Sequence, residues 1–256
     1  MVITEHLICY PEMDTLWNAR KLDVYKTSCA VNCVSYYVLR SLLVTRIPVS
    51  NVSVIGNLLD EDNQVFAIPN PNTIIFVACH PYEKGLDMFI EVAKLLRETN
   101  WHIDWYGVES ATFLEDYGVV QDIIDSAEIG NVVTVKGFVE HKELLTKYSS
   151  YSLLLSTSVS ETFGLSVAEA IMSRVPVVCT DSGGIRDFVN ERNGIIVPIG
   201  DSVAAVSAIE RLSKTVLDMA AASEEILKKY SKDNYKKKVI AVFNNAARTI
   251  KYSQNK

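Results

Sequence analysis

The chain has 256 residues, of which 48% are apolar and 22% charged, and its formal net charge is −6. This composition excludes an intrinsically disordered chain, and the negative charge argues against nucleic acid as a partner. The five cysteines are odd in number and no apolar run approaches the ~20 residues of a membrane span, so we expect a cytoplasmic protein with reduced thiols. A metal or redox site at Cys29 and Cys33 is the alternative.

The first 60 residues predict few elements: strand-like pieces at 2–4 and 22–25, a helix over 34–43 and a strand over 52–55. These pieces are too few to close a sheet of their own. The acidic, polar stretch 57–64 separates them from the rest of the chain. We therefore predict two domains, one over residues 1–60 and one over residues 61–256.

From Pro69 to Asp201, short β-branched runs alternate with stretches of helical periodicity. Helical patterns follow Asp87, surround Leu144 and run from Val167 to Ile171, and two further helices are predicted over 203–217 and 232–250. Strands that alternate with helices indicate βαβ units, so we predict an α/β fold with a doubly wound parallel sheet. The predicted strands of this sheet are 73–78, 102–106, 132–135, 153–156, 175–179 and 194–197.

The segment from residue 158 to residue 184 carries the clearest chemical pattern. Glu161 and Glu169 flank Phe163 and Gly164, and a helix is predicted to start directly after the glycine. Glycine lets a backbone approach a ligand closely, and the N-terminus of a helix favours anions. Carboxylates accept hydrogen bonds from hydroxyl groups. The pattern therefore suits a ligand that has both sugar hydroxyls and phosphates.

Glu161 and Glu169, with seven residues between them, resemble the Glu-x7-Glu signature of retaining GT-B glycosyltransferases of family 4, the glycosyl transferases group 1. Four further segments resemble this family in the same order along the chain, namely 83–87, 131–138, 176–187 and 193–201. The resemblance covers roughly residues 50–250. It implies a Rossmann-like C-terminal donor domain, preceded by a truncated, acceptor-side N-terminal domain over residues 1–60.

The resemblance also implies roles for single residues. Lys84 matches the lysine that contacts the donor diphosphate, Glu161 the glutamate beside the transferred sugar, and Glu169 the glutamate that holds the ribose hydroxyls. His6 matches a histidine near the reaction centre. The expected catalytic residues are Glu161, Lys84 and His6, and the expected donor-binding residues are Lys84, Phe163, Gly164, Leu165, Ser166 and Glu169.

Two positions depart from the family pattern and put donor affinity and turnover in question. Cys79 stands where the family usually has an arginine that contacts the diphosphate, and His80 or Arg186 could replace it. Arg174 stands where the family usually has a glycine.

Simpler interpretations remain open for several of these residues. Ser166 and Glu169 fit a helix capping box, and Glu161 alone would be a solvated loop acid. We interpret the Asp-x-Asp triplet at 60–62 as an acidic linker, and we expect no metal ion and no cofactor. His80, His102 and His141 show no partner pattern. The Lys-rich stretch 228–238 is interpreted as a solvated helix face, with weak association to a membrane surface as the alternative.

The resemblance implies transfer, with retention of configuration, from a UDP- or GDP-linked sugar to a glycan or lipid-linked acceptor in polysaccharide biosynthesis. One alternative is a nucleotide-sugar-binding domain that is inactive without a missing N-terminal half or a partner. Another is a related enzyme that hydrolyses or epimerises a nucleotide-sugar.

Overall fold

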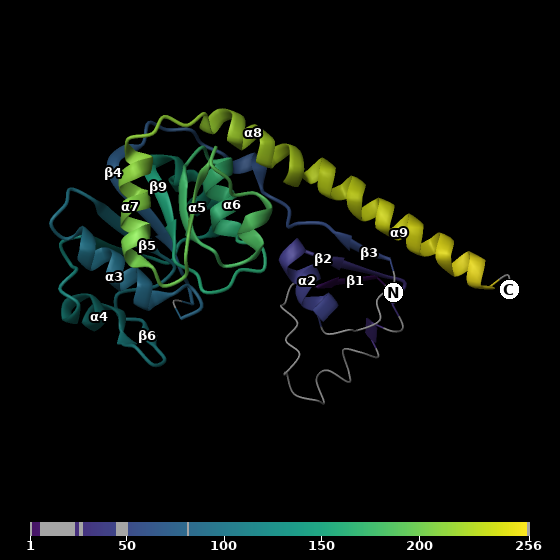
Figure 1. Cartoon of the computed structure of the whole chain (residues 1–256), viewed down its shortest axis with the longest axis horizontal. Helices are drawn as coiled ribbons and strands as arrows, with labels where there is room; N and C mark the ends of the chain where they lie inside the picture. The colour runs from purple at the N-terminus through teal and green to yellow at the C-terminus, as the bar shows by residue number, and fades with distance from the viewer. Residues whose placement is uncertain (1, 6–23, 26–27, 45–50, 81, 255–256) are drawn as a thin grey trace. The chain divides into compact units, whose positions relative to one another are not determined.

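The computed structural model describes residues 2–5, 24–25, 28–44, 51–80 and 82–254 (Figure 1). Contacts divide the chain into two compact units. Unit 1 consists of Met1–Asp60, Thr162–Gly164 and Lys228–Lys256, and unit 2 consists of Glu61–Glu161 and Leu165–Leu227. Each unit has its own parallel sheet.

Unit 2 is built on a six-stranded parallel sheet with the strand order β11-β10-β9-β4-β5-β8. The first three strands in sequence run outward in one direction from β4, and the last three run outward in the other from β9. This arrangement confirms the predicted doubly wound α/β fold. The strands are β4 (Asn70–Val77), β5 (His102–Tyr106), β8 (Val133–Gly137), β9 (Tyr151–Ser156), β10 (Val177–Thr180) and β11 (Gly194–Val197).

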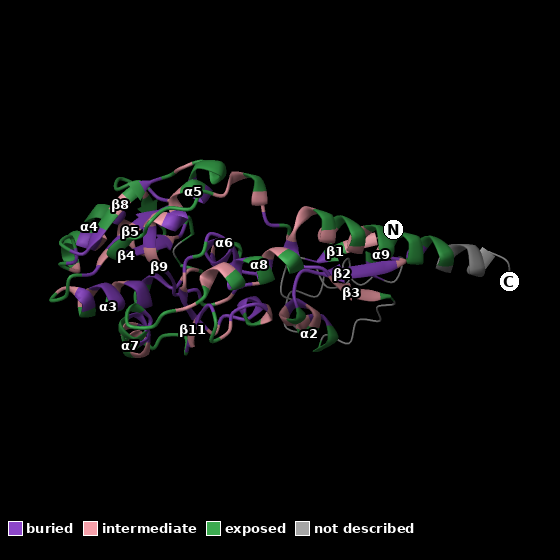
Figure 2. Cartoon of the chain, turned by 90° about the horizontal axis from the view of Figure 1, so that it is seen from above, coloured by how far each residue is buried: buried purple, intermediate pink, exposed green. Residues whose placement is uncertain are grey.

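Apolar side chains cover both faces of this sheet, which is why its strands lack strict alternation. Helices α3 (Leu86–Leu96), α4 (Val120–Ser126) and α7 (Ser202–Ser213) pack on one face (Figure 1), where Phe76 of β4 stacks on Phe89 with ring centroids 4.1 Å apart. Helix α6 (Leu165–Met172) packs against β9 and β10. Buried residues therefore concentrate along the strands and the inner sides of the helices (Figure 2).

Some elements of unit 2 were not predicted. They are α4, the short hairpin of β6 (Phe113–Leu114) and β7 (Gly118–Val119), and α8 (Met219–Tyr230). The helix predicted over 203–217 ends at Ser213 instead. A new helix, α8, begins at Met219, because the carboxylate of Asp218 accepts a hydrogen bond from the Ala221 amide (3.0 Å) and caps its N-terminus. The remaining short elements are η1 (Glu61–Asn63), α5 (His141–Lys147), η2 (Tyr148–Ser150) and η3 (Gly184–Asp187).

Unit 1 contains a three-stranded parallel sheet of β1 (Val2–Glu5), β2 (Ala30–Cys33) and β3 (Val52–Val54), with helix α2 (Tyr36–Val44). The expectation that the predicted pieces are too few for a sheet of their own was wrong, because the central strand β2 was missed. All four residues of β2 are buried, including the polar Asn32, so this short strand shows no alternation of apolar and polar residues that would predict it. The strand predicted at 22–25 was wrong for Val24 and Tyr25, which have helical backbone, and its first two residues lie outside the described residues.

The C-terminal helix α9 (Lys232–Gln254) belongs by its contacts to unit 1, whereas the sequence assigned it to the second domain. It packs on β2. Tyr230, just before it, accepts a hydrogen bond from the Leu59 amide (3.1 Å) and meets Phe163 edge-on at 5.1 Å between ring centroids. Within the part of the chain that the structure describes, no helix is both long and apolar enough to cross a bilayer.

Candidate functional site

Lys84, Glu161 and Glu169, three of the residues that the sequence predicted for the site, lie toward the carboxyl ends of the strands of unit 2. The strand order reverses between β4 and β9, and doubly wound sheets bind ligands in the crevice beside such a reversal. Lys84 lies on the loop after β4, and Glu161 lies on the loop after β9. The topology therefore brings together two side chains that are 77 positions apart in the sequence.

Glu161 is nearly buried, and its carboxylate is held by two donors. Lys84 Nζ lies 2.5 Å from Glu161 Oε1, and Ser158 Oγ donates to the same oxygen at 2.8 Å. The backbone of Glu161 is fixed as well, because its amide donates to the carbonyl oxygen of Ser182 (2.7 Å) and its carbonyl accepts from Gly184 (2.8 Å). Among the described residues, Glu161 Oε2 has no hydrogen-bond partner, so this oxygen can accept a bond from a ligand hydroxyl.

Gly85 places Lys84 by two features that only glycine supplies. Its φ of +67° lies in the left-handed region, and a Cβ at this position would collide with the carbonyl oxygen of Thr157. Thr157 Oγ1 in turn donates to the carbonyl oxygen of Lys84 at 2.6 Å. The loop after β4 is thereby fastened to the loop after β9, which keeps the ammonium group of Lys84 beside Glu161.

Glu169 forms a second cluster, on helix α6. Its residue is 4% exposed, and its two oxygens face different side chains: His141 Nε2 lies 2.7 Å from Oε1, and the Tyr148 hydroxyl donates to Oε2 at 3.1 Å. Burial, and then the nearby charge of Glu169, raise the pKa of Tyr148 well above its ordinary value. Tyr148 therefore remains a hydrogen-bond donor at every physiological pH.

His141 is the residue that the sequence analysis failed to identify, since it was treated as having no partner. It is the first residue of α5, directly after the β8 loop, and only the folded topology brings it to Glu169, 28 positions away. The sole sequence signal was its position at the start of a helix that follows a strand. Tyr148 follows the helix predicted around Leu144, and no role was predicted for it.

The remaining predicted donor-binding residues divide between the two units. Leu165 and Ser166 open helix α6 in unit 2, and their amides belong to the first turn of a helix, where N–H groups lack intrahelical partners. Phe163 and Gly164 group with unit 1, where the Phe163 ring is buried and Gly164 has a φ of +90°. His6 lies outside the described residues.

The departures from the family pattern are visible in the structure. Cys79 and His80 are exposed on the loop after β4. Arg186 forms a two-pronged contact with Asp181, which holds the pKa of that carboxyl below its usual range. Arg174 has a φ of +63°, which explains why glycine suits this position, and its guanidinium stacks on Phe66 at 4.0 Å.

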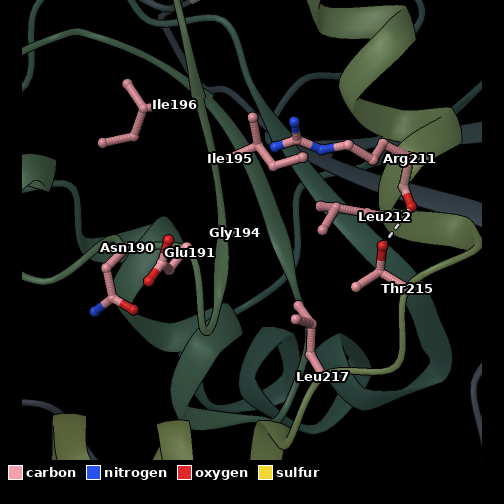
Figure 3. A pocket seen from close by; sticks show the side chains of 9 residues that line it. All are labelled: Asn190, Glu191, Gly194, Ile195, Ile196, Arg211, Leu212, Thr215 and Leu217. Carbon is pink, nitrogen blue, oxygen red and sulfur yellow. Dashed lines mark hydrogen bonds between the residues drawn. The ribbon is translucent and has the colours of Figure 1, made fainter.

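A separate hollow of about 350 Å³ lies at the other end of the sheet (Figure 3). It is lined by the start of β11, including Gly194 and Ile195, and by the end of α7, where Thr215 Oγ1 donates to the carbonyl oxygen of Arg211 at 2.8 Å. Of the predicted donor-binding and catalytic residues that the structure describes, none lines this hollow. The crevice at the carboxyl ends of the strands is therefore the better candidate site.

The chain is similar in sequence to known glycosyltransferases. Over 130 residues, the chain is 28% identical to the 2-deoxystreptamine N-acetyl-D-glucosaminyltransferase of Niallia circulans, covering 50% of the chain and 33% of that protein. Over 166 residues, it is 28% identical to the lipopolysaccharide core biosynthesis mannosyltransferase LpsB of Rhizobium meliloti, covering 62% of the chain and 47% of that protein. The chain thus spans less than half the length of these relatives.

The fold is similar to that of a crystallised S. aureus TarM variant in complex with fondaparinux, alpha-GlcNAc-glycerol and UDP, with a TM-score of 0.79 and 22% identity. The match covers 95% of this chain and 50% of that chain, and it supports the GT-B fold. The model of the family described as "Glycosyl transferases group 1" matches residues 60–237, which is more than half of the chain. The chain therefore belongs to the glycosyl transferases group 1 family.

Proposed function

We propose that the crevice of unit 2 binds a nucleoside diphosphate-sugar and that the protein transfers the sugar, with retention of configuration, to a glycan or lipid-linked acceptor in polysaccharide biosynthesis. The single observation that carries this proposal is the pair of buried carboxylates, Glu161 and Glu169, each held by hydrogen bonds at the carboxyl edge of one sheet. Two fixed acceptors suit a ligand with two sets of hydroxyl groups, the transferred sugar and the ribose.

The diphosphate is the part of the donor that gains charge as the sugar leaves. Lys84 and the amides of Leu165 and Ser166 at the start of α6 would stabilise that charge, since both an ammonium group and a helix N-terminus favour anions. Glu161 would hold hydroxyls of the sugar while positive charge develops on its ring. Preorganised groups of this kind are each worth roughly 3–4 kcal/mol to a transition state.

A second candidate function is donor binding without transfer. It is favoured by the length of the match, because the chain covers 33% and 47% of the two relatives above. On this hypothesis, transfer requires residues that the chain does not contain, or a partner protein. A third reaction, hydrolysis or epimerisation of the nucleotide-sugar, would differ from both in its products.

The first test is a thermal-shift titration with UDP, GDP, ADP and their common sugar conjugates. A ligand at 100 times its dissociation constant should add about 2.7 kcal/mol to the free energy of unfolding. We expect a clear shift with one nucleotide series in the wild type and its loss in Glu169→Ala. The matched control is Glu98→Ala, which changes an exposed acid between α3 and β5 and should keep the shift.

Each result has a defined meaning. If none of these nucleotides stabilises the wild type, or if Glu169→Ala binds as the wild type does, the proposed donor site is wrong. If the shift is as expected, assays with acceptor glycans and analysis of the anomeric product separate transfer from binding alone and from hydrolysis.

A further inference from the structure

We propose that Glu109 reads the base of the donor and selects guanine, so that the donor is a GDP-linked sugar. This inference rests on the proposed function, because it takes Glu169 as the residue that holds the ribose. It concerns a carboxylate that neither the family resemblance nor the site described above includes.

Glu109 lies on the loop after β5 and contacts the end of the neighbouring strand, β8. Its Oε1 accepts a hydrogen bond from the Phe138 amide at 3.0 Å. A Cβ at Gly137 would lie 2.8 and 2.9 Å from Glu109 Oε1 and Oε2, so the carboxylate lies directly against this residue, whose φ is +80°. The Gly107 amide donates to the carbonyl oxygen of Gly137 (3.0 Å) and ties the two loops together. The position of the carboxylate is therefore fixed by backbone.

The carboxylate is exposed and uncompensated. Among the described residues, no lysine, arginine or histidine forms an ion pair with Glu109, and its Oε2 has no hydrogen-bond partner. Beside it, the Phe138 ring is 62% exposed, which offers an apolar surface to a flat ligand. A charged acceptor and an aromatic surface thus share one edge of the sheet.

This edge adjoins the residue proposed to hold the ribose. His141, which contacts Glu169 at 2.7 Å, follows Phe138 by three residues, and three residues span at most about 10 Å. A nucleoside that is held by its ribose at Glu169 can therefore reach Glu109 with its base. The diphosphate cannot occupy this position, because an uncompensated carboxylate repels it.

The chemistry of the bases then decides between donors. A carboxylate only accepts hydrogen bonds, and each of its oxygens can accept more than one. Guanine presents two adjacent donors, N1–H and the N2 amino group, which match the two oxygens of Glu109. Uracil flanks its single N–H with two carbonyl oxygens, and adenine places a ring acceptor next to its amino group, so neither matches a carboxylate.

The test is isothermal titration of the whole chain with GDP, inosine diphosphate, UDP and ADP. Inosine diphosphate differs from GDP only in lacking the N2 amino group. For the wild type we expect GDP to bind about ten to a hundred times more tightly than the other three ligands. This is the discrimination that two hydrogen bonds from one side chain to a base provide. Glu109→Gln, which keeps an acceptor for the Phe138 amide, should narrow the gap between GDP and inosine diphosphate to threefold or less. Glu98→Gln is the control that should leave it unchanged.

The outcomes separate this inference from the function on which it rests. Wild-type binding of UDP or ADP as tight as that of GDP overturns the inference and leaves the proposed donor site intact. The inference is also overturned, with the donor site intact, if the ratio of the affinities for GDP and inosine diphosphate is the same in Glu109→Gln as in the wild type. If no nucleoside diphosphate binds, the proposed function fails, and the inference fails with it.

Discussion

Glu161 and Glu169 are two buried carboxylates at the same edge of unit 2, but different partners hold them. Glu161 is paired with the ammonium group of Lys84, whose side chain is 28% exposed. Glu169 is paired with His141, whose side chain is 57% exposed, and with the fully buried hydroxyl of Tyr148. Glu161 thus has an ammonium group among its partners, whereas the partners of Glu169 include a buried hydroxyl and an exposed imidazole ring.

The difference bears on what each glutamate can do. Lysine carries a full positive charge at neutral pH, so the Lys84–Glu161 pair offers both charges to a ligand in the crevice. On the proposed function, a diphosphate can contact the ammonium group, and a sugar hydroxyl can contact Glu161 Oε2, which has no hydrogen-bond partner among the described residues. Glu169 is more firmly enclosed, which suits a residue that anchors a part of the ligand that does not react. On the proposed function, the Glu161 cluster would act on the reacting sugar and the Glu169 cluster would anchor the ribose.

The largest expected effect tests this division of roles. Glu161→Gln removes the negative charge beside the transferred sugar, so transfer should fall by roughly a hundredfold to a thousandfold, the range for losing one preorganised group. Affinity for the nucleoside diphosphate alone should change less than about threefold, because that ligand has no transferred sugar. Glu169→Gln should instead weaken the affinity for the nucleoside diphosphate by more than threefold. The measurements are turnover of the sugar donor and titration calorimetry; equal losses of nucleotide affinity in both variants would contradict the division.

The sequence predicted one of these clusters more completely than the other. Lys84 and Glu161 carry recognisable motifs, and the topology of a doubly wound sheet brings the two loops together. His141 carries no motif. It reaches Glu169 because α5 starts at the end of β8, and neither the strand order nor the start of that helix can be read from a single residue.

The fold shows the same limit. The six strands of unit 2 were predicted because β-branched runs are separated by helical periodicity, and β5 and β11 have the predicted bounds. β2 was missed because its four buried residues carry no period. The assignment of α9 to unit 1 was also not predictable, since α9 packs on β2, about 200 positions earlier in the sequence.

A smaller effect is expected when the cation of the Glu161 cluster is removed. Breaking a fully buried ion pair costs about 3–5 kcal/mol, but Lys84 is partly exposed, so Lys84→Met should lower the free energy of unfolding by only about 1–2 kcal/mol. Adding Glu161→Gln should recover most of this loss, because it removes the unpaired charge. Urea unfolding measures both variants. Lys94→Met, which breaks an exposed pair with Glu91, is the control; a double variant as unstable as the single one would refute charge compensation.

The smallest effect separates the two partners of Glu169. Tyr148→Phe removes a buried hydroxyl that donates to Glu169, so it should lower the free energy of unfolding by about 1 kcal/mol. His141→Gln changes an exposed ring and should cost less than about 0.5 kcal/mol. Tyr117→Phe, which removes an exposed hydroxyl 3.4 Å from Asp87, is the matched control. Urea unfolding distinguishes these variants. If His141→Gln lowers the free energy of unfolding by more than Tyr148→Phe does, the exposed ring rather than the buried hydroxyl holds Glu169. The proposed difference between the two clusters would then be wrong.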